Sequence, residues 1–66
     1  MGYLFDGKKY MTVNAVVRSA FRKHGPNVDA FTTAERKLVV KRDSVIIATY
    51  AISEPKVGQL MTVTPV

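Results

Sequence analysis

The sequence predicts an α+β fold made of an N-terminal β-hairpin, one amphipathic helix and a small antiparallel sheet. Three observations favour this fold: an Asp-Gly turn between two short aromatic segments, one stretch with helical periodicity and clear end signals, and a long β-branched stretch in the second half. We expect residues 1–66 to form a single small domain that buries about 60% of the surface of its unfolded chain.

The hairpin is expected at residues 3–11. Asp6 and Gly7 are one of the best pairs for a type I′ turn, because both central positions of that turn need positive φ. Tyr3 and Phe5 alternate on the first strand, and Tyr10 follows on the second.

The helix is expected at about residues 12–24. Thr12 is a good N-cap, and Gly25 followed by Pro26 gives a strong stop. Cationic residues fill the last turn, where they oppose the negative end of the helix dipole. The apolar residues that recur at the spacing of one helical face are Val13, Val16, Val17, Ala20 and Phe21.

The rest of the chain is expected to form an antiparallel sheet of two or three strands at about residues 37–64, packed on the helix. We interpret residues 27–33 as a connection. A strand at residues 37–41 is expected to pair with a long strand at 44–52, which is rich in β-branched residues. A last strand at residues 59–64 is expected at an edge of the sheet.

An alternative fold remains open for residues 32–41. Thr32 and Glu35 fit a capping box, which indicates a second helix in that segment. The chain would then form a helix-turn-helix with a C-terminal hairpin, a winged-helix-like arrangement in which the second helix contacts DNA.

The strand at residues 44–52 is apolar on both of its faces, which is typical of a strand buried on both sides. One helix covers only one face. The other face of the strand would be covered by the hairpin or by a second subunit, so the sequence also predicts a homodimer.

The composition gives a net charge of +5, from ten Lys and Arg against five Asp and Glu. This balance favours an acidic partner, either nucleic acid or an acidic protein surface. The chain has no Cys and a single His, so we expect no disulfide, no metal site and no cofactor. No secretory signal and no apolar run of about 18 residues is visible, so we expect a cytoplasmic protein without a membrane partner.

An enzyme is not expected. His24 has no nucleophile at a suitable spacing, and the five carboxylates are scattered, mostly in turns. Residues 2–9 match the first seven positions of a phosphate-binding P-loop, but Lys9 occupies the eighth position, where the motif requires Ser or Thr.

The sequence favours a small basic, regulatory protein that binds DNA or RNA without catalysis. Arg and Lys side chains can follow a phosphate backbone if their clusters meet on one side of the fold. The residues predicted to bind nucleic acid are Arg18, Arg22, Lys23, Arg36, Lys37, Lys41 and Arg42. Lys8 and Lys9 form a further cluster at the hairpin.

The alternative function is a protein-interaction module, such as a small inhibitor or an accessory subunit. Its partner would contact the hairpin aromatics Tyr3, Phe5 and Tyr10, or the exposed edge of the last strand.

Overall fold

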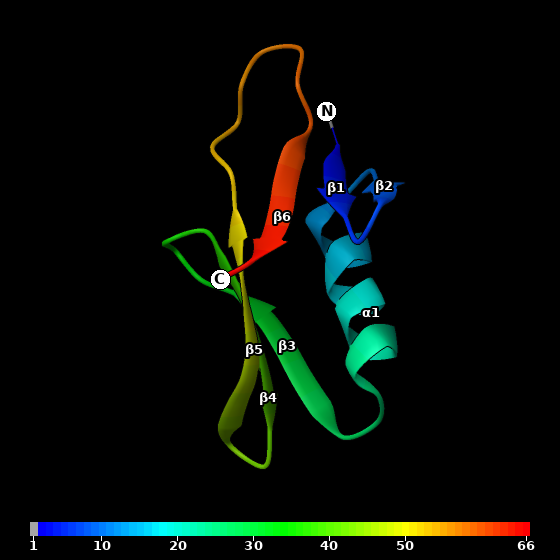
Figure 1. Ribbon diagram of the computed structural model, residues 1–66, viewed down its shortest axis with the longest axis vertical. Helices are drawn as coiled ribbons and strands as arrows, with labels where there is room; N and C mark the ends of the chain where they lie inside the picture. Colours follow the sequence, from blue (N-terminus) through cyan, green and yellow to red (C-terminus); the bar gives the residue numbers. More distant parts are fainter. Residues whose placement is uncertain (1) are drawn as a thin grey trace.

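The computed structural model describes residues 2–66 and shows one six-stranded sheet with one helix packed against its concave face (Figure 1). The elements are β1 (Tyr3–Phe5), β2 (Lys8–Tyr10), α1 (Val13–His24), β3 (Val28–Thr32), β4 (Lys37–Arg42), β5 (Val45–Ile52) and β6 (Met61–Pro65). The strand order is β2-β1-β6-β5-β4-β3. Every neighbouring pair is antiparallel except β1 and β6, which run parallel. The sheet curls around α1 into half a barrel.

The prediction of a two- or three-stranded sheet at residues 37–64 is therefore wrong. That segment supplies only β4, β5 and β6, and the same sheet continues through the parallel β1–β6 pair into the N-terminal hairpin. The chain is mostly sheet with one short helix.

The helix-turn-helix alternative is wrong as well. Residues 32–41 form the end of β3, a turn and most of β4. Leu38 and Val40 are fully buried on one side of β4, so alternate residues of this segment fill the core as a strand requires. The Thr33 hydroxyl accepts a hydrogen bond from the Lys37 N–H at 3.3 Å, and this bond belongs to the turn between the two strands.

The predicted hairpin and the predicted helix are confirmed. Asp6 and Gly7 have φ values of 55° and 78°, and β1 pairs with β2 around them. Thr12 caps α1 by accepting a hydrogen bond from the Ala15 N–H at 3.2 Å. Gly25 ends the helix with a φ of 88°, and its N–H donates to the Phe21 carbonyl.

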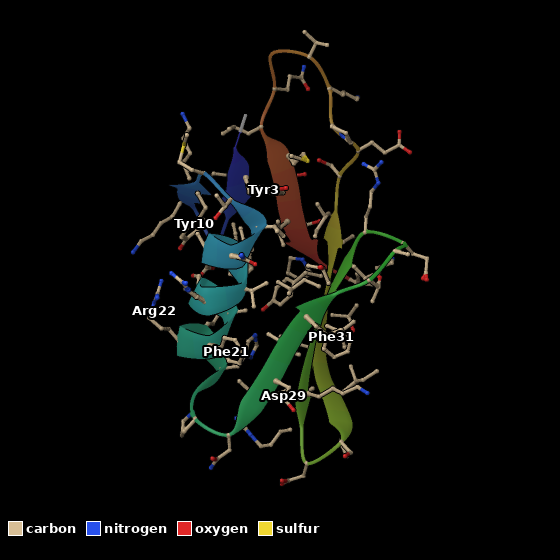
Figure 2. The ribbon with its side chains drawn as sticks, turned by 180° about the vertical axis from the view of Figure 1, so that it is seen from behind. Tyr3, Tyr10, Phe21, Arg22, Asp29 and Phe31 are labelled. Atoms are coloured by element: carbon tan, nitrogen blue, oxygen red, sulfur yellow. The ribbon has the colours of Figure 1, made fainter. Side chains whose placement is uncertain are left out.

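Two strand positions differ from the prediction. Residues 27–33, interpreted as a connection, contain β3, whose side chains alternate between the core (Val28) and the outer surface (Asp29 and Phe31). Phe31 projects from β3 on the side away from α1 (Figure 2). The last strand, β6, is not an edge strand, because it lies between β1 and β5.

The predicted pair β4–β5 is confirmed, with a two-residue turn at Asp43 and Ser44, whose φ values are 51° and 67°. The register shifts by one residue between Val40 and Lys41. This bulge leaves an extra residue on β5, at Ile47.

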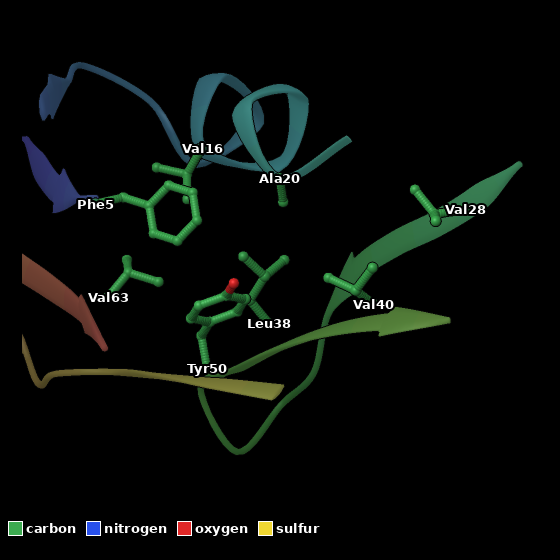
Figure 3. Packing of buried hydrophobic residues seen from close by; sticks show 8 residues of the cluster. All are labelled: Phe5, Val16, Ala20, Val28, Leu38, Val40, Tyr50 and Val63. Atoms are coloured by element: carbon green, nitrogen blue, oxygen red, sulfur yellow. The ribbon is translucent and has the colours of Figure 1, made fainter. Parts of the chain in front are cut away.

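The core lies between α1 and the concave face of the sheet (Figure 3). Its buried members are Phe5, Val16, Ala20, Val28, Leu38, Val40, Tyr50 and Val63. The other face of the sheet is the outer face. The hairpin does not cover it, because the hairpin is part of the sheet, and Ile46 and Ile47 are 56% and 41% exposed. In the described part of the chain, no helix is long and apolar enough to cross a membrane.

Candidate nucleic-acid interface

The positive charge of this protein is concentrated in its first 25 residues. The hairpin and α1 contain five cations, Lys8, Lys9, Arg18, Arg22 and Lys23, against the single acid Asp6. In the remaining residues, four of the five cations are balanced by four carboxylates. The fifth is Arg42, whose side chain returns to the end of α1. The net charge of +5 therefore lies around α1 and the hairpin.

Arg18 and Arg22 point away from the sheet. Val16 and Ala20 face the core, and successive helical residues turn by about 100°, so both arginines lie about 140–180° from the buried side. They are four residues apart, so their positions differ by about 6 Å along the helix axis. Both are exposed, and neither forms a salt bridge within residues 2–66. Arg22 extends from the outer side of α1 (Figure 2).

The hairpin is joined to α1 by two polar contacts. The Tyr10 hydroxyl lies 2.8 Å from the Ser19 hydroxyl, and the Lys23 ammonium lies 3.2 Å from the Asp6 carboxylate. Lys8 alternates with Tyr10 along β2 and so projects on the side of the hairpin that faces α1. Lys8 thereby adds a cation beside the second half of α1.

The Lys23 ammonium is held by an acid and two aromatic rings of the same chain. It pairs with Asp6 and lies 5.7 Å and 5.9 Å from the ring centres of Phe5 and Tyr50. The hydrogen bond to Asp6 is the largest cause that raises the pKa of Lys23, followed by the electrostatic effect of Tyr50. This lysine contributes charge to the surface, but its position is fixed by these partners.

Arg42 closes the C-terminal end of α1. Its Nη2 atom donates a hydrogen bond of 2.7 Å to the His24 carbonyl, one of the carbonyl groups that a helix leaves without a partner. The neighbouring His24 ring is 2.8 Å from the Tyr50 hydroxyl, which ties the last turn to the core. The structure thus brings four of the predicted residues, Arg18, Arg22, Lys23 and Arg42, to one helix.

The other three predicted residues lie elsewhere. Arg36 stands in the turn between β3 and β4, and Lys37 and Lys41 project from the outer face of β4. The Lys41 ammonium lies 5.6 Å from the centre of the Phe31 ring, and Asp29 is opposite Lys41 in the strand register. The sheet separates Lys37 and Lys41 from the cations of α1, and Arg36 lies at the end of the sheet, near Val13 at the opposite end of α1 from Arg22.

Sequence reasoning left Lys8 out of the predicted binding residues. Alternation along the second strand of the hairpin puts Lys8 and Tyr10 on the same side. The contact between Tyr10 and Ser19, which places that side against α1, has no local signal in the sequence.

The residues predicted for a protein partner are mostly engaged inside the fold. Phe5 is 1% exposed and packs edge-on against Tyr50. Tyr10 is hydrogen-bonded to Ser19, and Tyr3 is half-buried. The exposed aromatic rings are instead those of Phe21 and Phe31, at 39% and 41%.

Among residues 2–66, no three His, Asp or Glu side chains lie close enough together to hold a metal ion. Comparisons with protein-family models, with curated proteins and with solved structures find no match for this chain.

Proposed function

We propose that this protein binds nucleic acid through a cationic face formed by the hairpin and the outer side of α1. The cationic face consists of Lys8, Arg18, Arg22, Lys23 and Arg42. Lys9 is not part of it, because Lys9 lies opposite Leu4 in the register and points to the other side of the hairpin. The observation that supports this function is the gathering of these five cations around α1, where Asp6 is the single acid of the hairpin and the helix.

The geometry of the face suits a phosphate backbone. Arg18 and Arg22 are exposed, share one side of the helix and present planar guanidinium groups that bind phosphate oxygens in pairs. About four phosphate contacts would give a slope of about −3.6 in a plot of log affinity against log salt for duplex DNA, and about −2.8 for a single strand.

The test compares two charge-matched double variants. Arg18→Gln with Arg22→Gln removes two cations from the cationic face, and Lys37→Gln with Lys41→Gln removes two from the outer face of the sheet. Binding to fluorescein-labelled single-stranded and duplex 20-mers, of both DNA and RNA, is followed by fluorescence anisotropy between 50 and 200 mM salt. Circular dichroism verifies that both variants fold.

We expect the helix variant to lose affinity and to reduce the duplex salt slope by about 1.8, because each phosphate contact contributes about 0.9. The sheet variant should keep a slope close to that of the wild type. The proposal is refuted if the wild type binds none of the oligonucleotides at 50 mM salt, or if both variants lose affinity equally.

A second candidate function is protein interaction at the outer face of the sheet, including the homodimer that the sequence predicts. The observation that favours it is the exposure of Phe31, Ile46 and Ile47 on the outer face, away from the cations of α1. Two copies that meet there avoid bringing their cationic faces together. Light scattering at tens of micromolar measures this directly: a dimer that Ile46→Lys dissociates supports it, and a monomeric wild type contradicts it.

A further inference from the structure

A hollow lies at the C-terminal end of α1, where the chain turns into β3. It is shallow and open to solvent, with a volume of about 420 Å³. Its lining residues are Phe21, Arg22, Gly25, Pro26, Asn27 and Val28. The hollow adjoins the cationic face, because Arg22 belongs to both.

The floor of the hollow is apolar. Phe21 is 39% exposed, and Val28 beside it is buried in the core. Pro26 has a fixed backbone φ, and Gly25 contributes no side chain at a φ of 88°. A Cβ atom on Gly25 would have only the guanidinium of Arg42 for a neighbour, at 4.0 Å. The backbone at Gly25 is therefore open on the side where a side chain would stand.

The rim of the hollow is polar and positively charged. Arg22 lines one side, and the Arg42 guanidinium lies close to Gly25, where the His24 carbonyl holds it. Asn27 is exposed at a φ of 65°. Its amide offers two donors and one acceptor, a combination that pairs with the edge of a nucleobase.

These features together fit a planar aromatic group that carries an anion. An aromatic ring and a proline provide apolar surfaces for stacking, an amide can bind the edge of the stacked group, and two guanidinium groups can bind its phosphates. An apolar protein side chain would contact the floor but would leave the polar groups of the rim without hydrogen-bond partners. A base inside a duplex cannot enter the hollow without leaving its stack.

We propose that the hollow beside Phe21 holds an unpaired nucleobase, so that the protein's substrate class is single-stranded nucleic acid. This inference depends on the proposed function, because the phosphates of the same strand would lie on the cationic face. Phe21 stacks on the base, Asn27 binds its edge, and Arg22 and Arg42 bind the adjoining phosphates.

The test uses tryptophan as a local reporter, because the natural sequence has no Trp. Phe21→Trp places an indole in the hollow, and Phe31→Trp places one on the opposite side of β3 at nearly the same exposure. Each variant is titrated with the single strand (dT)12 and with a 12-base-pair duplex. A base that stacks on the indole quenches its fluorescence, so we expect quenching of Phe21→Trp by (dT)12 and little change in Phe31→Trp.

Affinity gives a second measurement. Base stacking on an aromatic side chain corresponds to about a 5- to 150-fold change in affinity when the ring is removed. We expect Phe21→Leu to weaken (dT)12 binding within this range, and Phe31→Leu to change it less than twofold. Asn27→Gly is an independent second variant, which keeps a residue suited to positive φ while removing the amide. We expect Asn27→Gly to weaken (dT)12 binding, and this variant tests the inference even if Phe21→Leu does not fold.

The outcomes separate the inference from the proposed function. If the wild type binds neither (dT)12 nor the duplex, the proposed function fails and the inference fails with it. If the wild type binds nucleic acid but prefers the duplex, or if the two tryptophans are quenched equally, the inference alone is overturned.

Discussion

Replacing Leu38 with Ala tests whether residues 32–41 form a strand of the core. The Leu38 side chain is 0% exposed, and the change removes three carbon atoms from the concave side of β4. Transfer of these atoms to water costs about 2.4 kcal/mol, at about 0.8 kcal/mol for each buried methylene. The remaining cavity increases the loss, so we expect about 3–4 kcal/mol, within the range measured for Leu→Ala in protein cores.

A loss of this size is large for a chain of 66 residues, whose free energy of unfolding is expected to be about 3–10 kcal/mol. With a urea dependence of about 1 kcal/mol per molar, the unfolding midpoint of Leu38→Ala should fall by about 3 M. Urea titration followed by circular dichroism measures the midpoint. The control is Leu4→Ala on the outer face of β1, where Leu4 is 39% exposed and the expected loss is below about 1 kcal/mol. Equal losses for the two variants would show that Leu38 is not in the core.

Two further predictions concern α1 and its contact with the hairpin. Thr12→Ala removes the acceptor for the Ala15 N–H and should lower the free energy of unfolding in urea by about 1 kcal/mol. Thr12→Ser keeps the acceptor and is the control. Equal losses of stability in the two variants would contradict the cap. The raised pKa of Lys23 means that the folded chain holds this proton more tightly than the unfolded chain, so the pair with Asp6 stabilises the fold below pH 10.5 and is lost as the pH rises through the raised pKa. Between pH 10 and 12 the wild type should therefore lose more stability than Lys23→Gln, and parallel losses would show that the pair contributes nothing.

Local signals in the sequence were sufficient for the hairpin, the helix and the β4–β5 pair. Each of these depends on neighbours in the chain: Asp6 and Gly7 at positive φ, Thr12 and Gly25 at the helix ends, and a two-residue turn between two β-branched segments. Where a structure is determined by residues a few positions apart, the types and spacing of those residues are enough to predict it.

The arrangement of the sheet depends on pairs far apart in the chain. The parallel contact of β1 with β6 joins Tyr3 to Met61, and no local pattern indicates it. The strand β3 was missed because Asp29 and Ala30 are poor strand formers, and because the strand follows a Gly-Pro-Asn turn directly. Pairing with β4 overrides these weak preferences, since Val28 enters the core and Phe31 lies opposite Val39.

The positions of single cationic side chains also depend on contacts between residues far apart in the chain, which local sequence signals do not indicate. Arg22 and Lys23 are adjacent in sequence, and both are cationic residues in the last turn of a helix. The fold makes them different, because Lys23 points toward Asp6 and the rings of the core while Arg22 has no salt-bridge partner in the described chain. Arg42 is distant in sequence but lies at the end of the helix because β4 follows β3 back past His24.

Phe21 illustrates how a ligand site can follow from the end of a helix. Its spacing assigns it to the apolar side of α1, yet it lies about 120° from the middle of the buried side, midway between Val16 and Ala20. A residue at the margin of the apolar side is usually covered by the next packed element. Here Gly25 and Pro26 end the helix one turn later and turn the chain into β3, so the ring stays 39% exposed. The same stop signal that fixes the length of α1 therefore leaves an aromatic surface open beside Arg22, where an unpaired base and its phosphate can both be bound.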